Sequence, residues 1–128
     1  MPADVLLVED NVPEARLIEQ IAAHGSASIR ITTANDCSGA LARLSDTHIK
    51  LRLVIADMGV LEFGGVELLG RCNPRGIPVV IFTGSNNPAD AAHALALGAK
   101  EFVVKPTELD EYAEAVWRMI SKWTVPQV

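Results

Sequence analysis

The sequence predicts an α/β fold, a doubly wound sheet of five parallel strands with helices on both faces. Three observations lead to this prediction. Short apolar runs rich in Val and Ile recur along the chain, which is typical of strands buried on both faces and therefore of a parallel sheet. Amphipathic segments of helical length separate these runs. Strand and helix alternate five times, and five βα units of this size form a three-layer sandwich.

The first strand is expected at residues 5–8, which are apolar throughout. A helix follows it, because Asn11 and Pro13 are typical start signals and Gly25 is a typical stop signal. Residues 28–33 alternate apolar and polar side chains, which predicts an edge strand.

Asn35 or Asp36 is expected to cap a second helix that continues through Leu44. The third strand covers residues 53–56 and ends in front of an aspartate. A glycine-rich loop then leads to a short helix at residues 66–72. The glycines of this loop are Gly59, Gly64 and Gly65.

The fourth strand is expected at residues 79–82, followed by an alanine-rich helix at residues 89–97. The boundary signals of this helix are Asn87, Pro88 and Gly98. The fifth strand covers residues 101–104. Apolar side chains at helical spacing then predict a last helix, which begins at a pair that resembles a capping box, Thr107 and Asp110.

Composition and charge restrict the classes of function. The 128 residues suffice for one domain, which we expect to span residues 1–128 with its core at 4–123 and a short C-terminal tail. A net charge of −5 argues against a nucleic-acid-binding surface. No apolar stretch approaches the ~20 residues of a membrane span, and the start lacks a secretory signal, so a cytoplasmic location is expected. The two cysteines, Cys37 and Cys72, lack metal-ligand spacing and are expected to be packing residues.

Chemically active side chains stand where four of the apolar runs end. These are Asp10, Asp57, Thr83 and Lys105. In an open parallel sheet, the carboxyl ends of the strands form the ligand crevice. The strand order 2-1-3-4-5 would place the ends of the first and third strands side by side. Two acids, a hydroxyl and an ammonium at one edge suit a phosphoryl group together with a metal ion.

Glu9, Asp10 and Asp57 are expected to lie within a few ångströms of one another. Two unit charges ~4 Å apart repel by about 4 kcal/mol at a surface-like dielectric, so such a cluster needs protons or a cation. Oxygen ligands without nearby His or Cys favour Mg²⁺, with Mn²⁺ as the alternative. A carboxylate in this place can attack phosphorus and form an aspartyl phosphate. Lys105 and Thr83 would then bind the phosphoryl oxygens.

Four segments together resemble the receiver domain of two-component response regulators, of the stand-alone single-domain type. They are residues 5–11, 54–57, 81–84 and 98–106, in the order and at the spacing of that family. The resemblance implies a flavodoxin-like fold. It also implies that Asp57 accepts a phosphoryl group from a histidine kinase or a phosphotransfer protein. Such a domain would catalyse its own phosphorylation and slow dephosphorylation but would not turn over free substrates.

The same resemblance implies roles for individual residues. Its metal ligands would be Asp10, Asp57, the carbonyl of Gly59 and, mostly through water, Glu9. Thr83 and Lys105 would contact the phosphoryl group, and Phe102 would be the aromatic switch residue. Movement of Thr83 and Phe102 would reshape the face made by residues 89–97, residues 101–104 and the last helix, where a downstream protein would bind.

The segment after Asp57 departs from the family pattern. Leu61 stands where the family usually has proline, and Gly64-Gly65 stands where it usually has Asp-Gly. The missing aspartate removes a cap from the helix at residues 66–72, so the loop after Asp57 is expected to be more mobile.

Two further expectations concern partners. The segment 9–11, followed by Arg16 and Leu17, resembles small regulators paired with bacterial phytochromes. An exposed tryptophan on the last helix, Trp117 or Trp123, would indicate a homodimer contact.

Two alternative functions stay open. One is a pseudo-receiver, which would bind proteins without being phosphorylated. The other is a phosphatase of the haloacid-dehalogenase-like type, which pairs its nucleophile with a second Asp two residues later as acid and base. Here that position is Gly59, so repeated hydrolysis of free substrates is not expected.

Overall fold

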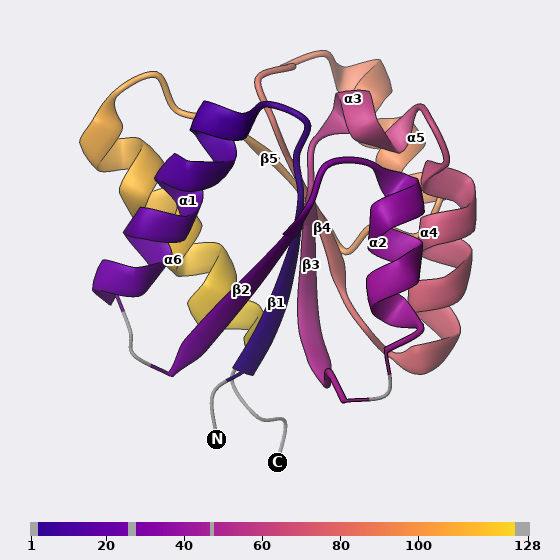
Figure 1. The fold of residues 1–128 in the computed structure, drawn as a ribbon. Helices are drawn as coiled ribbons and strands as arrows, with labels where there is room; N and C mark the ends of the chain where they lie inside the picture. The colour runs from indigo at the N-terminus through magenta and orange to yellow at the C-terminus, as the bar shows by residue number, and fades with distance from the viewer. Residues whose placement is uncertain (1–2, 26–27, 47, 125–128) are drawn as a thin grey trace.

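The computed structural model describes residues 3–25, 28–46 and 48–124, and it has the architecture that the sequence predicts (Figure 1). The strands are β1 (Ala3–Val8), β2 (Ile29–Ala34), β3 (Leu51–Ala56), β4 (Val79–Thr83) and β5 (Glu101–Val104). They form one parallel sheet in the order β2-β1-β3-β4-β5, which confirms the predicted order. Of the predicted tail, residues 124–128, Thr124 is the last residue of the last helix and residues 125–128 lie outside the described residues.

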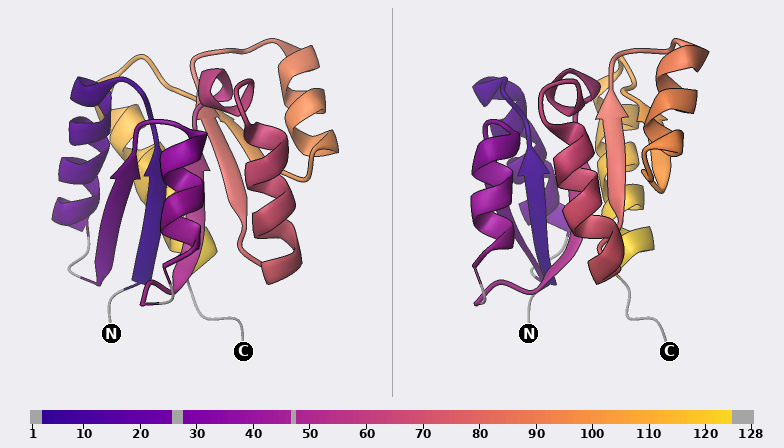
Figure 2. Two further views of the ribbon diagram at one scale, coloured as in Figure 1. Left: turned by 45° about the vertical axis from the view of Figure 1, so that its right-hand side comes forward. Right: turned by 90° about the vertical axis from the view of Figure 1, so that its right-hand side faces the viewer.

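Helices cover both faces of the sheet (Figures 1 and 2). On one face lie α1 (Val12–Gly25) and α6 (Leu109–Thr124). On the other lie α2 (Cys37–Leu44), α3 (Met58–Leu61), α4 (Gly65–Cys72) and α5 (Pro88–Ala96). A single 3₁₀ turn, η1 (Asn73–Arg75), follows α4. Because α3 is additional, the predicted third, fourth and fifth helices are α4, α5 and α6. None of the helices in the described ranges is long and apolar enough to cross a bilayer.

The central strands are apolar on both faces because each face has its own core. Along β1, Val5 and Leu7 belong to the core under α1 and α6, whereas Leu6 and Val8 belong to the core under the other four helices. All four side chains are almost completely buried. Alternate residues of a strand point to opposite faces, so a sheet with two cores requires the continuous apolar runs seen in the sequence.

Polar side chains cap three helices at the predicted positions. The caps are Asn11, Asp36 and Asn87, whose side-chain oxygens accept the N–H groups of Glu14, Gly39 and Ala89 at 3.0, 2.7 and 2.9 Å. The prediction for α6 is wrong by one residue. This helix begins at Leu109, so its N-cap position is residue 108. Thr107 lies one residue before that position and cannot form a capping box with Asp110.

The prediction of a glycine-rich loop directly after Asp57 is also wrong, because this segment forms α3. The Asp57 side chain caps α3 by accepting the Gly59 N–H at 2.9 Å. Three apolar side chains of α3 are buried against the sheet and the neighbouring helices, and this burial stabilises the short helix. They belong to Met58, Val60 and Leu61.

One departure from the family pattern, Leu61, fits a glycine that the pattern shares, Gly65. Gly64 adopts the left-handed conformation (φ 102°) and provides no side-chain cap for α4, as the sequence predicts. At Gly65, a Cβ atom would meet the Leu61 side chain, so glycine at this position leaves the space that Leu61 fills. The leucine and the glycine are therefore complementary parts of one core.

A buried charge near the start of β1 permits a test of the fold by pH. Arg30 of the neighbouring strand donates to Asp4 (Nε to Oδ1, 2.6 Å), and the Lys50 N–H donates to Oδ2 at 3.3 Å. The hydrogen bond from Arg30, despite the opposing effect of burial, holds the pKa of Asp4 below its ordinary value of 3.8.

We expect Asp4→Asn to lower the free energy of unfolding by about 1 kcal/mol at neutral pH, since Arg30 is largely exposed and its attraction is screened. A lowered pKa in the folded state contributes stability above the unfolded pKa, and that contribution disappears as the pH falls through the folded value. Urea titrations should therefore show the two proteins converging below about pH 4. A constant difference down to about pH 2 would contradict this account.

Candidate functional site

Backbone pairing brings the predicted site residues to one edge of the sheet. Glu9 and Asp57 directly follow β1 and β3, and the Asp57 N–H donates to the Val8 carbonyl at 3.4 Å. The Lys105 N–H donates to the Thr83 carbonyl at 2.6 Å, which joins the ends of β4 and β5. These hydrogen bonds position the residues at the carboxyl edge independently of their side chains.

Lys105 lies at the centre of a cluster of three carboxylates. Its Nζ atom is 3.2 Å from Asp57 Oδ1, 3.5 Å from Glu9 Oε2 and 2.7 Å from Glu14 Oε2. We call these four residues the Lys105 cluster. An ammonium group has three N–H donors, so the three carboxylates can engage all of them.

The cluster is only partly accessible to water, and this strengthens its electrostatics. Burial raises the pKa of Glu9, although the Asn11 N–H and the charge of Lys105 act in the opposite direction. Burial alone would lower the pKa of Lys105, but the hydrogen bond to Glu14 and the charges of Asp57 and Glu9 outweigh it and raise this pKa. Lys105 therefore stays charged at neutral pH. Its Nζ also lies over the Phe82 ring, 5.8 Å from the centroid.

The Asp57 carboxylate is held by two donors. One oxygen accepts from Lys105, and the other accepts from the Gly59 N–H as the cap of α3. Its side chain is 21% exposed, so one side remains open to a reacting partner. The arrangement orients a carboxylate oxygen, a possible nucleophile toward phosphorus, beside a fixed positive charge that can bind phosphoryl oxygens.

Thr83 and Phe102 lie on the same face of the sheet. In the β4–β5 register, Ile81 pairs with Phe102 and Thr83 pairs with Val104. Since Phe102 packs in the same core as Ile81, alternation along the strand places Thr83 on this face also. The Thr83 side chain is buried, and its Oγ1 accepts the Ser85 N–H at 3.3 Å.

Asp10 and Gly59 lie in the wall of a neighbouring hollow of about 400 Å³, to which Asp36 and Glu62 also contribute. Asp10 is exposed and forms no ion pair within the described part of the chain. Among the described residues, no group of three or more His, Cys, Asp or Glu side chains is arranged to hold a metal ion. The structure thus joins Glu9 and Asp57 through Lys105 and leaves Asp10 outside the cluster.

The chemistry of the donors nevertheless fits a divalent cation. A cationic group already bridges the carboxylates of Glu9 and Asp57, and the buried Glu9 disfavours its own negative charge. The side chains offered are oxygen donors, which suit a hard metal ion.

Comparison with known proteins identifies the family of the chain. The family model for the response regulator receiver domain matches residues 5–117. The chain belongs to this family. Receiver domains of response regulators are signalling modules of two-component systems.

Two curated relatives illustrate the match. The methanogenesis regulatory protein FilR1 of Methanothrix harundinacea is 31% identical over 93% of the chain, which spans only 29% of that protein. The two-component response regulator ORR3 of Oryza sativa subsp. indica is 29% identical, and the match covers 92% of this chain and 91% of the relative.

Solved structures show the same CheY-like, flavodoxin-like fold. The Mn²⁺-bound form of response regulator Rcp1 superposes with a TM-score of 0.81 at 23% identity, covering 99% of this chain and 98% of the other. The phosphorylated cyanobacterial phytochrome response regulator RcpA has a TM-score of 0.83 at 23% identity, covering 100% of this chain and 98% of the other.

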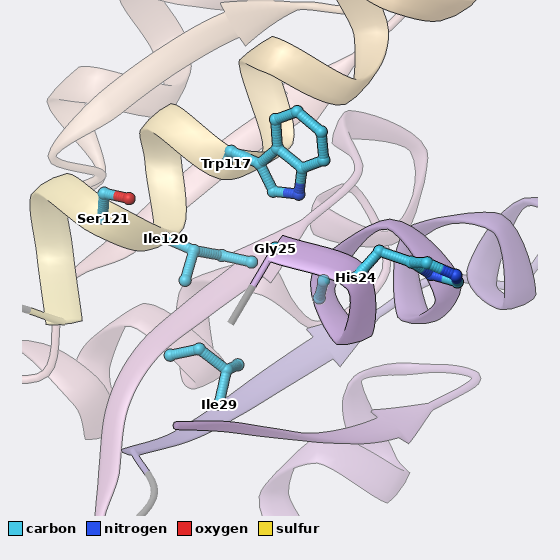
Figure 3. Close-up of a pocket in the computed structure, with 7 residues that line it drawn as sticks. His24, Gly25, Ile29, Trp117, Ile120 and Ser121 are labelled. Carbon is cyan, nitrogen blue, oxygen red and sulfur yellow. The ribbon is translucent and has the colours of Figure 1, made fainter. Parts of the chain in front are cut away.

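A second hollow of this receiver domain lies away from the site. It has a volume of about 410 Å³ and lies between α6, the end of α1 and the start of β2 (Figure 3). Trp117 and Ile120 line it from α6, opposite Gly25 and Ile29. A Cβ at Gly25 would meet the Trp117 indole, whose Nε1 donates to the Ile21 carbonyl at 2.8 Å. The glycine therefore lets α1 and α6 approach closely.

Glu14 is the member of the Lys105 cluster that the sequence did not reveal. It lies in the first turn of α1, where acidic residues are common because their negative charge interacts favourably with the positive end of the helix dipole. The signal that could have identified it is its position one turn after Glu9-Asp10, which brings it back to the same edge of the sheet.

Proposed function

We propose that this receiver domain accepts a phosphoryl group on Asp57 and thereby switches a protein-binding face. The observation that carries the proposal is the Asp57 carboxylate at the end of β3, with one oxygen 3.2 Å from the Lys105 ammonium inside a half-buried acidic cluster. We take the domain to span residues 1–128 and to work in the cytoplasm.

In the proposed transfer, the reacting and phosphoryl-binding side chains all lie at this edge of the sheet. An oxygen of Asp57 attacks the phosphorus of a phosphohistidine, the P–N bond breaks, and the released imidazole takes a proton from water. Lys105 and Thr83 bind the oxygens of the transferred group, which adds about −1.5 to −2 charge units. The domain acts on itself and turns over no free substrate.

The proposal includes a Mg²⁺ ion, with Mn²⁺ as a substitute. Glu9, Asp10, Asp57 and the carbonyl of Gly59 would hold it. When bound, such an ion would offset part of the negative charge gathered by the acids and the phosphoryl oxygens.

The partners follow from the same reaction. The phosphoryl group would come from a sensor histidine kinase or a phosphotransfer protein, and the resemblance of residues 9–11 and 16–17 favours a phytochrome-linked one. A downstream protein would bind the α5-β5-α6 face, where Leu95 and Val104 are exposed. A homodimer through the partly exposed Trp117 also stays a prediction.

Incubation with acetyl phosphate and Mg²⁺, followed by intact mass spectrometry, tests this function. We expect one added phosphoryl group, mapped to Asp57 in peptides, and none when EDTA is present. Absence of any adduct would favour the pseudo-receiver. Sustained release of phosphate from many esters would favour a phosphatase, although Gly59 provides no acid or base for it.

The switch can be tested at Thr83. Its attraction to a phosphoryl oxygen contributes about 1.5–3 kcal/mol, enough to shift a two-state equilibrium roughly tenfold to a hundredfold. We therefore expect Thr83→Ala still to accept the phosphoryl group, while the NMR shift changes of the Phe102 ring on phosphorylation largely disappear. Unchanged Phe102 shifts in this variant would contradict the coupling.

A further inference from the structure

Glu14 makes the shortest contact of the Lys105 cluster. Its Oε2 is 2.7 Å from Lys105 Nζ, compared with 3.2 Å for Asp57 Oδ1 and 3.5 Å for Glu9 Oε2. The Glu14 N–H donates to Asn11 at the start of α1, so the backbone that carries this carboxylate is fixed by a helix cap. Lys105 is therefore held from α1 as well as from the strand ends.

Tyr112 fixes the Glu14 carboxylate from the opposite helix. The Tyr112 hydroxyl on α6 donates to the same Oε2 atom at 2.6 Å. The Tyr112 ring is buried and packs against Phe82, with centroids 5.1 Å apart and an interplanar angle of 58°. Phe82 in turn lies beneath the Lys105 ammonium. Two helices and one strand thus form a continuous set of contacts around Lys105.

The three carboxylates that contact Lys105 have different roles in the proposed reaction. In the proposed reaction, Asp57 becomes the acyl phosphate and Glu9 belongs to the acids that would hold a cation. Glu14 has neither task. Glu14 can therefore keep its contact with Lys105 when Asp57 is phosphorylated and Glu9 binds a cation.

We propose that Glu14, oriented by Tyr112, is a positioning residue that keeps the Lys105 ammonium beside Asp57 during phosphoryl transfer. This inference rests on the proposed function of Asp57. Glu14 itself touches neither the donor nor the transferred group. It acts by limiting the positions that the long lysine side chain can adopt.

The test compares Glu14→Gln with Glu19→Gln, which removes the same charge from α1. The Glu19 side chain forms no ion pair or hydrogen bond within the described ranges. With acetyl phosphate and saturating Mg²⁺, we expect Glu14→Gln to lower the rate of phosphorylation about tenfold, and Glu19→Gln to change it by less than about twofold. Equal rates in the two variants would overturn the proposal.

A double-mutant cycle separates positioning from a general structural role. Tyr112→Phe keeps the ring on Phe82 and removes only the hydroxyl, so its rate should fall about threefold. In the Glu14→Gln background the same change should have no further effect, because both act through one carboxylate. Two independent, multiplying losses would contradict the inferred arrangement.

A measurement without metal or phosphodonor keeps this inference distinct from the proposed function. NMR of ¹⁵N-lysine-labelled protein should show a slowly exchanging Lys105 ammonium signal in wild type and Glu19→Gln, and should lose it in Glu14→Gln. If wild type never accepts a phosphoryl group, the proposed function fails, whatever this spectrum shows. If it does accept one but Glu14→Gln matches Glu19→Gln in rate and spectrum, only the role of Glu14 fails.

Discussion

Asp57→Asn is expected to take up no phosphoryl group under conditions in which the wild-type domain takes up one. The amide lacks the negatively charged oxygen that attacks phosphorus, so the reaction loses its nucleophile. Thr83 and Lys105, which would bind the phosphoryl oxygens, remain in place. Intact mass after incubation with acetyl phosphate and Mg²⁺ measures this loss directly.

The substitution should leave the fold intact, which makes the result interpretable. Asn caps helices about as well as Asp, so it can still accept the Gly59 N–H at the start of α3. Lys105 retains its contacts with Glu9 and Glu14. The matched control is Asp110→Asn, an exposed change on α6 that should accept the phosphoryl group normally. An equal adduct on Asp57→Asn would place the acceptor elsewhere.

Phe82→Ala is expected to cause the largest loss of stability among the substitutions considered, about 3–5 kcal/mol. The Phe82 side chain is 1% exposed in the core under α1 and α6 and packs against the Tyr112 ring. Its removal leaves a cavity and ends that ring contact. Because a domain of this kind has about 5–15 kcal/mol in total, much of the protein would be unfolded at moderate urea concentrations.

Two controls accompany this measurement of the free energy of unfolding in urea. Phe63 is 80% exposed, so Phe63→Ala makes the same chemical change and should alter stability by about 0.5 kcal/mol or less. Phe82→Leu keeps most of the volume and should lose about 1–2 kcal/mol. Equal losses for the two alanine variants would show that the Phe82 ring contributes no core packing.

The fold could be predicted because its determinants are local. Runs that are apolar on both faces specify strands in the middle of a parallel sheet, and Asp36 and Asn87 specify helix starts by capping. The short helix α3 escaped prediction for a physical reason. Gly59 lowers its intrinsic helix propensity, whereas its stability comes from burial against distant elements and from the Asp57 cap.

The candidate site also has a part that could be predicted from the sequence and a part that could not. Asp57, Thr83 and Lys105 could be placed from sequence because each backbone position is set by the end of a strand. The contact between Lys105 and Glu14 could not, since the direction of a long side chain depends on which of several charges attracts it most. Asp10 is exposed and lies outside this set of contacts.

The packing of α1 against α6 has a consequence for biosynthesis. Val5 and Leu7 of β1 leave the ribosome early, yet the core that buries them also contains Val116 and Met119 of α6, which is made much later. Until α6 is translated, this face of the nascent sheet can be covered by α1 alone. A ribosome-bound fragment that stops before residue 109 should therefore bind chaperones that recognise exposed apolar surface. A longer fragment in which α6 has left the ribosome should no longer bind them.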